Sequence, residues 1–367
     1  MNSDEQLYIQ RHTVYAHILS DAKAAEAIAF ENQFSADSVR GRLSKGNTAQ
    51  ANFALAKQAS LDLPKEPIGT KRQEHVIELS EGKFYGQKVM HEVRGEEIAV
   101  ATLADPHLPY TRWDAVELAM MILQDIKKLA YVTVGHDLID NDGYGRWEDN
   151  RPAAGKMWSS DVSNIRKAEA AWYRMITGTV PQAQMLEVMG NHDVWYFNHL
   201  RTNEPQSSEK ILADYMEWKQ EQGVLQFSSG KERSIELSPN LILWHGQFVS
   251  KLSTTNAKNT IEQFMRGGIA KSVIVGHTHR PAVIAGHNIG YAGVNFYNAP
   301  CLSRLESIPY MKRDPNGWEL GLNVNFFVPN TREERGYNII FKERGSYLIA
   351  NFNDREYSVK LDRTVAK

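Results

Sequence analysis

Two histidines separated by one residue, His277 and His279, are the side chains of this 367-residue chain whose type and spacing best suit metal chemistry. They follow three β-branched apolar residues and Gly276, a pattern that predicts a buried strand ending in a sharp turn. Histidines at this spacing share a face on a strand and can converge on one centre in a loop, so neutral imidazoles here suit metal ligation. Two polar loop histidines without a ligand are the alternative, and matching ligands elsewhere must decide between the two.

Side chains of the same chemistry follow four other predicted strands. Asp105 and His107 come after an apolar run at residues 98–104, and an acidic oxygen with an imidazole at the carboxyl end of a strand makes half of a metal site. Strands predicted at 130–134, 185–189 and 241–244 end, in that order, in His136 and Asp137, in Asn191, His192 and Asp193, and in His245. Five predicted strand ends therefore carry potential ligands or proton donors.

The elements that position these residues alternate between strand and helix from residue 97 onward, which is typical of a layered α/β fold. Helices are predicted at about 112–128, 161–177 and 209–222. Residues 143–160, rich in Gly, Trp, Arg and Asp, read as a long loop over the site. The tail at 337–361 alternates around two turns, at 344–346 and 353–355, and predicts a three-stranded meander.

Composition places the chain among ordinary globular proteins. It is 42% hydrophobic and 23% charged with a formal charge of -2, which argues against disorder and against a strongly basic protein. A single cysteine, Cys301, excludes an intrachain disulfide framework and fits a reducing compartment. The absence of an apolar run of about eighteen residues and the polar start predict a cytoplasmic protein without a membrane segment.

The N-terminal region predicts a separate helical domain. Residues 1–73 form this domain and its linker, and residues 74–367 form the second domain with the C-terminal meander. Ser35 suits the N-cap of a helix that leaves Arg40, Arg42 and Lys45 exposed, which resembles a helix-turn-helix that reads DNA. Gly41 and the equal numbers of acidic and basic residues in 1–75 oppose this reading. A helical packing or oligomerisation module is the alternative.

The order of the five motifs resembles that of calcineurin-like metallophosphoesterases, over about residues 97–300. The resemblance implies a layered β-sandwich flanked by helices. One position departs from the family pattern, because His136 stands where a glycine usually precedes the second aspartate. This leaves the role of His136 open and favours Asp137 over Asp140 as the ligand.

The resemblance also implies two divalent metal ions, with manganese first and iron, zinc or nickel as alternatives. One ion would be held by Asp105, His107, Asp137 and His279, and the other by Asp137, Asn191, His245 and His277. A bridging carboxylate with neutral nitrogen and amide ligands keeps both ions Lewis acidic.

Catalytic and substrate-binding roles follow from the same resemblance. His192 would be the general acid or a donor to the phosphate, with Asp193 orienting its ring; a structural histidine is the alternative. His136, Asp140, Asn141 and Arg280 would touch substrate or serve structure.

The resemblance implies a phosphoester substrate, and the motifs leave its class open. The helix-turn-helix-like segment, basic and aromatic residues in the 143–160 loop and a likeness to phosphoesterases of phages and prophages favour DNA, whereas the nearly neutral charge opposes it. A metal-dependent nuclease or phosphodiesterase acting on DNA is therefore the leading hypothesis. A phosphomonoesterase acting on proteins or nucleotides, and a DNA-binding regulator with a vestigial site, are the alternatives. The oligomeric state stays open.

Overall fold

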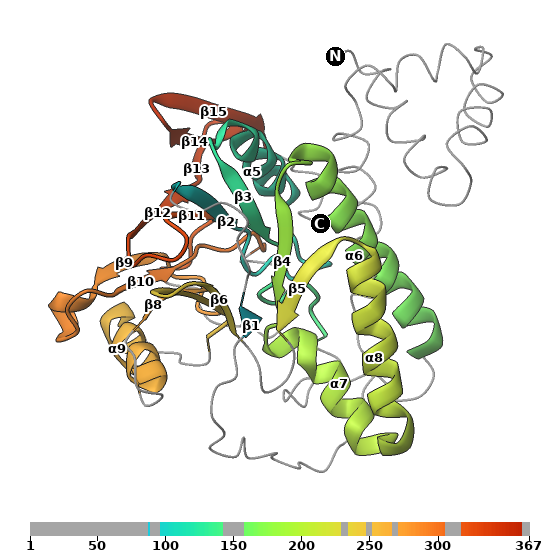
Figure 1. Ribbon diagram of the computed structural model, residues 1–367. Coiled ribbons are helices and arrows are strands. Elements are labelled where there is room, and N and C mark those ends of the chain that lie inside the picture. The colour runs from blue at the N-terminus through green and yellow to red at the C-terminus, as the bar shows by residue number, and fades with distance from the viewer. Residues whose placement is uncertain are drawn as a thin grey trace, which may run out of the picture. The chain divides into compact units, whose positions relative to one another are not determined.

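A computed structural model describes residues 87–88, 96–141, 158–228, 234–246, 252–265, 271–304 and 317–361 (Figure 1). The chain divides into two compact units, one of residues 1–65 and 156–181 and the other of residues 66–155 and 182–367. The predicted helical domain at 1–73, with Arg40, Arg42 and Lys45, lies outside the described residues. The described part of the first unit contains helix α6 (Trp158–Thr179). The second half of α6 buries Ala168, Ala171, Trp172, Met175 and Ile176 at helical spacing.

One six-stranded sheet of the second unit contains the predicted strands at 98–104, 130–134 and 185–189. Its order is β12 (Glu334–Ile340), β11 (Gly321–Phe327), β2 (Ile98–Thr102), β3 (Leu129–Thr133), β4 (Gln184–Val188) and β5 (Val224–Ser228). Strands β2 to β5 run parallel, while β11 is antiparallel to both of its neighbours. Parallel strands bring their carboxyl ends to one edge, so the residues that follow β2, β3 and β4 meet there.

The other six-stranded sheet carries the histidine motifs of the second half of the chain. Its order is β1 (Gln87–Lys88), β6 (Ser234–Ser238), β7 (Leu241–Trp244), β8 (Ser272–Val275), β10 (Asn295–Asn298) and β9 (Ala282–Ala285). Strands β7, β8 and β10 are parallel, and all residues of β7 and β8 are buried. Continuous apolar runs are typical of strands that are covered on both faces.

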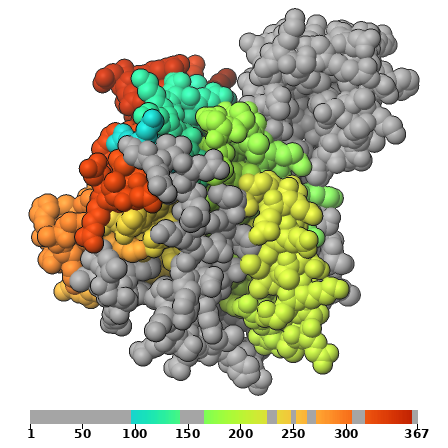
Figure 2. All heavy atoms as spheres, viewed as in Figure 1, coloured from blue at the N-terminus to red at the C-terminus, as the bar shows by residue number. Residues whose placement is uncertain are grey.

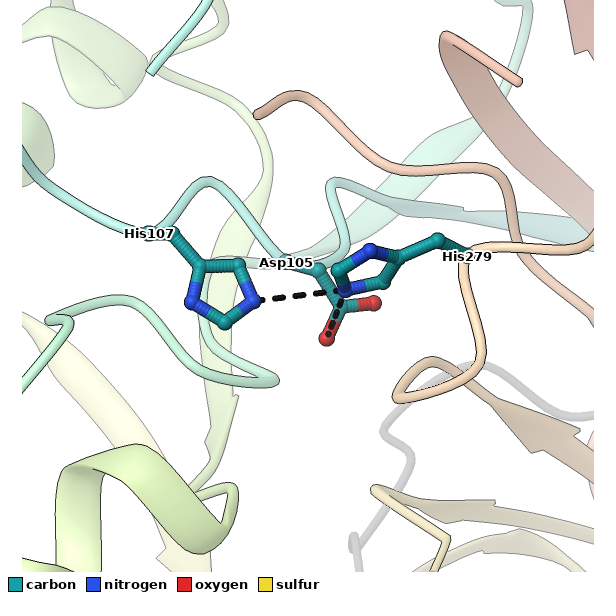
Figure 3. Close-up of side chains that lie close together, drawn as sticks. All are labelled: Asp105, His107 and His279. Carbon is teal, nitrogen blue, oxygen red and sulfur yellow. Dashed lines mark hydrogen bonds and ion pairs between the residues drawn. The ribbon is translucent and has the colours of Figure 1, made fainter. Parts of the chain in front are cut away.

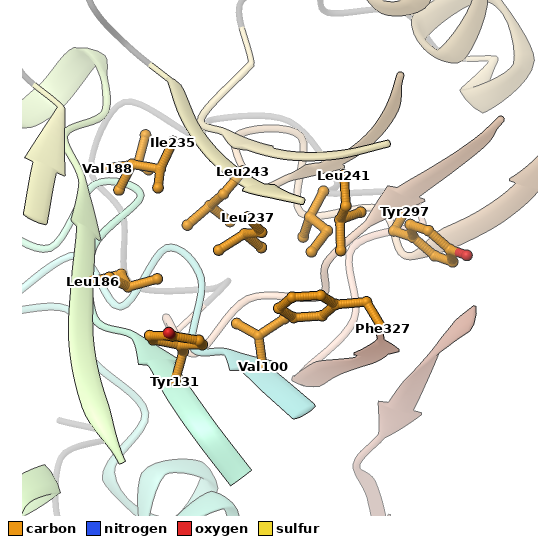
Figure 4. Close-up of a cluster of buried hydrophobic side chains, with 11 residues drawn as sticks. Val100, Tyr131, Leu186, Val188, Ile235, Leu237, Leu241, Leu243, Tyr297 and Phe327 are labelled. Carbon is orange, nitrogen blue, oxygen red and sulfur yellow. The ribbon is translucent and has the colours of Figure 1, made fainter. Parts of the chain in front are cut away.

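The core of the second unit lies between the two sheets. Apolar side chains from both sheets meet there, and all are buried: Val100, Tyr131, Leu186, Val188 and Phe327 from the first sheet, and Ile235, Leu237, Leu241, Leu243, Ile274 and Tyr297 from the second (Figure 4). Each such side chain contributes about 1.5–3 kcal/mol by leaving water. The architecture is therefore mixed α/β with two facing sheets, as the sequence predicts.

Helix α5 (Trp113–Asp125) is buried on more than one face because it contacts β11 as well as β14 (Tyr347–Phe352) and β15 (Arg355–Lys360). With β13 (Lys342–Arg344), these last two strands form a separate three-stranded sheet. The red ribbons of β14 and β15 lie beside the teal helix α5 in Figure 1, and the red and teal atoms are also neighbours on the surface in Figure 2. The predicted meander thus exists but begins at Lys342, because β12 pairs with β11 in the first sheet.

Three further α-helices and a short 3-10 helix, Gly286–Ile289, belong to the described part of the second unit. Helices α7 (Asn191–Asn203) and α8 (Pro205–Glu221) contact each other, and α9 (Ser253–Met265) contacts β8 and β9. Of these, α8 is close to its predicted range, whereas α7 and α9 are not predicted. Within the described residues, no helix has the length and apolar character that crossing a membrane requires.

Candidate metal centre

The predicted ligands gather where strand ends of both sheets meet. Asp105 and His107 follow β2, Asp137 follows β3, and Asn191 is the first residue of α7 after β4. His245 follows β7, and His277 and His279 follow β8. The structure therefore brings together all seven residues predicted as metal ligands, from two sheets and from positions far apart in the chain.

One cluster consists of Asp105, His107 and His279. The Nε2 atoms of the two histidines are 3.3 Å apart, and Nε2 of His279 is 3.6 Å from Oδ1 of Asp105 (Figure 3). One donor atom from each of the three side chains lies within 4.8 Å of the others, and all three side chains are buried. Donor atoms that converge in this way, with their carbon atoms turned outward, match the arrangement around a cation.

A second cluster surrounds Nε2 of His245. This atom lies 3.2 Å from Oδ2 of Asp137, 3.1 Å from Nδ1 of His277 and 3.1 Å from Oδ1 of Asn191. A single ring N–H cannot serve three such partners at once. A cation shared by the four side chains satisfies all of them, so this cluster fits a metal ion on the chemistry of its donors.

Electrostatics favours the neutral, ligating form of two histidines. Burial lowers the pKa of His277 to about 3, with repulsion from His245 adding to the effect. Burial also lowers the pKa of His279. Metal ligation requires the deprotonated ring nitrogen, so both side chains are prepared for it at neutral pH.

The backbone of the site is strained at the predicted ligands. Asp105, His107, Asp137, His277 and His279 all have positive φ, between 48° and 66°. This conformation costs roughly 1–3 kcal/mol for each residue and persists only where the surrounding structure enforces it. The carboxylate of Asp105 contributes to this restraint, because it accepts the backbone N–H of His277 at 2.9 Å and 3.1 Å.

Two glycines make room for the acidic ligands. A Cβ atom on Gly190 would lie 1.9 Å from Oδ1 of Asp137, and one on Gly276 would lie 2.7 Å from Oδ2 of Asp105. Both distances are far below ordinary van der Waals contact. The glycines of these two motifs are therefore required by close approach to the carboxylates.

His192 lies beside the first cluster, in the first turn of α7. Its Nδ1 atom is 2.9 Å from Oδ1 of Asp140, whose other oxygen is 3.0 Å from Nδ1 of His107. Asp140 thus links the predicted general acid to a predicted metal ligand. Its backbone amide is held by the carbonyl of Leu108 at 2.9 Å, which fixes the carboxylate between the two rings.

The prediction that Asp193 orients the ring of His192 is wrong. Asp193 is the third residue of α7, and its carboxylate turns back toward the start of the helix. It accepts backbone N–H groups of Asp137, Leu138, Ile139 and Gly190 at 2.8–3.3 Å. Asp193 therefore joins the loop of Asp137 to the helix that carries Asn191 and His192.

The carboxyl group of Asp193 is held in an unusual electrostatic setting. Burial raises its pKa to about 7, and the nearby charges of Asp137 and Glu187 add to the shift while Lys219 opposes it. Lys219 in α8 donates to Glu187 in β4, and both side chains are fully buried. The ammonium group of Lys219 neutralises the buried carboxylate of Glu187, whose charge acts on Asp193.

The residues predicted to touch substrate occupy different places. His136 is fully buried; neither of its ring nitrogens has a hydrogen-bond partner among the described residues, and it belongs to neither cluster. Burial lowers the pKa of His136 to about 3, so its ring is neutral. Asn141 donates to the carbonyl of His192 at 3.1 Å, and Arg280 follows His279 with its side chain partly buried.

Two tryptophans that the sequence analysis does not single out adjoin the site. The ring of Trp195 is 3.9 Å from that of His192, and the ring of Trp318 is 4.1 Å from that of His279, between centroids. Trp195 stands three residues after His192, a spacing that brings side chains together on a helix, so a prediction of α7 would have found it. Trp318 has no such signal in the sequence.

The fold and the site define a mixed α/β protein with buried aspartate and histidine clusters that can hold metal ions. No protein-family model matches the chain, and no curated protein matches its sequence. Among solved structures, a metallophosphoesterase from Sphaerobacter thermophilus is similar, with a TM-score of 0.32 and 14% sequence identity. The similarity covers 66% of this chain and 87% of that protein. Because it is weak, the assignment of a function depends on the donor geometry.

Proposed function

We propose that the chain is a calcineurin-like metallophosphoesterase that hydrolyses phosphodiesters with two divalent metal ions. The observation that carries the proposal is the pair of adjacent donor clusters, Asp105, His107 and His279 beside Asp137, His245 and His277, with Asn191 completing the second. Clusters that mix carboxylate, imidazole and amide donors suit manganese, iron, zinc or nickel. The carboxylate of Asp137 would be shared between the two ions.

The protein's own residues supply positioning and proton transfer. When bound, two divalent ions polarise the phosphoryl oxygens and lower the pKa of water at the site. His192 would donate a proton from Nε2 to the leaving oxygen as the P–O bond breaks, because Asp140 engages the other ring nitrogen, Nδ1. Asp193 would act indirectly, because its carboxylate accepts the backbone N–H of Asp137 and so helps to position that residue.

Replacing Asp137 by asparagine tests the site. We expect Asp137→Asn to abolish Mn²⁺-dependent hydrolysis of bis(p-nitrophenyl) phosphate and to weaken Mn²⁺ binding measured by calorimetry, with the far-UV circular dichroism unchanged. Asp125→Asn is the matched control, because Asp125 lies at the end of α5 and pairs with Arg355 at the surface. Full activity in Asp137→Asn would refute the assignment.

DNA is the leading substrate, supported by the basic and aromatic residues of the 143–160 loop and by the helix-turn-helix-like segment of the sequence. Mn²⁺-dependent cleavage should be compared on single-stranded DNA, duplex DNA and a phosphopeptide at one salt concentration. Cleavage of the phosphopeptide alone would favour the phosphomonoesterase alternative. Unchanged DNA affinity after joint replacement of Arg40, Arg42 and Lys45 by alanine would contradict a DNA-reading role for the predicted domain at 1–73.

A further inference from the structure

An unbroken row of ring contacts crosses the site and ends in a tryptophan on each side. Trp195 contacts His192, His192 contacts His107 with centroids 4.7 Å apart, His107 contacts His279 at 5.2 Å, and His279 contacts Trp318. The two indoles therefore adjoin different histidines, at opposite ends of the row. One end is the predicted proton donor, and the other is a predicted metal ligand.

Both indoles are held in place while part of their surface stays accessible to solvent. Trp195 is fixed by α7, which also carries His192. The segment of Trp318 is fixed by a backbone hydrogen bond of 3.1 Å from the N–H of Glu319 to the carbonyl of His279. Each indole is only partly buried, unlike Trp113 and Trp244, which lie in the core.

A partly accessible indole beside polar side chains offers an apolar, planar face that a flat ligand can cover. Indoles of this kind form stacking platforms for unpaired bases, since every base presents a π-face. They do not suit a paired base, whose faces are already occupied by its neighbours in the duplex.

We propose that Trp195 and Trp318 bind the nucleobases on the two sides of the scissile phosphate, so that the substrate is a single-stranded nucleic acid. A phosphodiester has two organic arms, and the site offers two aromatic platforms on either side of His107 and His279. A phosphomonoester has one arm and would leave one platform unused. Trp195, beside His192, takes the base on the leaving-group side, and Trp318 takes the base on the other side. This inference rests on the proposed function.

The test measures binding separately from hydrolysis. The probe is a thymidine dinucleotide with a phosphorothioate linkage, and its control is the same dinucleotide with both bases replaced by hydrogen. Their charges are equal, and both are too short to reach a distant surface. With the full-length protein in Mn²⁺, titration calorimetry should show that the bases increase affinity by roughly 30-fold or more, the smaller end of the range for stacking on two indoles.

Trp195→Leu and Trp318→Leu should each remove about half of this advantage on a logarithmic scale, and Trp195→Phe should restore part of it. Trp218→Leu is the matched control, because this partly buried tryptophan of α8 stacks on Tyr215 and should leave the advantage unchanged. Because Phe keeps an aromatic face, its rescue separates stacking from a failure to fold.

Equal affinity of the protein for the two dinucleotides would overturn the inference. Leucine variants that bind both dinucleotides more weakly, by the same factor, would also overturn it, since the indoles would then only hold the histidine rings in place. Tighter binding of a phosphotyrosine peptide than of the thymidine dinucleotide would also overturn it. Hydrolysis of bis(p-nitrophenyl) phosphate is measured in parallel. Base-dependent binding without any hydrolysis would support the inference and refute the proposed reaction, whereas hydrolysis without a preference for bases would do the reverse.

Discussion

Replacing Gly190 by alanine should displace Asp137 in the proposed metal centre without straining the φ and ψ angles of residue 190 itself. Gly190 has φ of -85° and ψ of -174°, which any residue adopts. The added Cβ would lie 1.9 Å from Oδ1 of Asp137 and 2.6 Å from its backbone nitrogen. A side-chain rotation of Asp137 cannot relieve the contact with the nitrogen, so the loop that carries the carboxylate must move.

The size of the effect follows from the displacement required. Ordinary contact begins at 3.4 Å, so the carboxylate oxygen must retreat by about 1.5 Å. A misplacement of about 1 Å at a catalytic centre costs on the order of 100-fold in rate. We therefore expect kcat/KM for bis(p-nitrophenyl) phosphate to fall by about 100-fold or more, equivalent to roughly 2.7 kcal/mol. Calorimetry should show weaker binding of Mn²⁺ by the same variant.

Gly290→Ala provides the opposite control. Gly290 has φ of 93°, and a Cβ there would meet nothing within 4 Å. Its replacement should cost about 1–2 kcal/mol of stability through the left-handed backbone, measured by urea unfolding, and leave activity unchanged. Gly190→Ala with wild-type activity and wild-type affinity for Mn²⁺ would refute the idea that close packing of Gly190 sets the position of Asp137.

Two further replacements test the groups that support the site. Asp140→Asn should lower kcat by about 100-fold for a phosphodiester with an alkyl leaving group. The loss should be much smaller for a p-nitrophenyl ester, because p-nitrophenolate leaves without a proton. Equal losses for both substrates would contradict a role of Asp140 in proton donation by His192. Lys219→Met leaves the buried carboxylate of Glu187 without its cation, so the free energy of unfolding measured in urea should fall by about 3–5 kcal/mol. The double variant with Glu187→Leu should recover most of this loss. A double variant no more stable than Lys219→Met would show that the ion pair itself is not the cause.

The sequence predicts the strands, and the polar residues at their ends, because both depend on local pattern; the assignment of these residues as metal ligands comes from the family resemblance and stays a prediction. Short runs of mostly buried, apolar residues mark β2, β3, β4 and β8, and the candidate ligands follow within five residues of each strand end. Helix α7 is different, since its first turn consists of the polar residues Asn191, His192 and Asp193, which read as a loop. Helix α9 has only four apolar residues, Ala257, Ile261, Phe264 and Met265, which stand at helical spacing but are few within a polar stretch.

The partners of the site residues are beyond local pattern. Asp193 is adjacent to His192 in sequence, which suggests that the two interact, yet successive side chains on a helix point in directions about 100° apart. The ring of His192 instead meets Asp140, which follows β3 and is separated from it by 52 residues. Only the parallel pairing of β3 with β4 brings these two segments together.

The origin of the ligands in both sheets has a consequence for folding kinetics. Asp105, His107, Asp137 and Asn191 come from the edge of one sheet, whereas His245, His277 and His279 come from the edge of the other. Neither cluster is complete until the two layers have docked, so a cation would have no high-affinity place in an early intermediate. Ions that bind only the folded sandwich slow its unfolding and leave the rate of its formation almost unchanged. The proposed metal ions would therefore stabilise the contact between the two layers after folding.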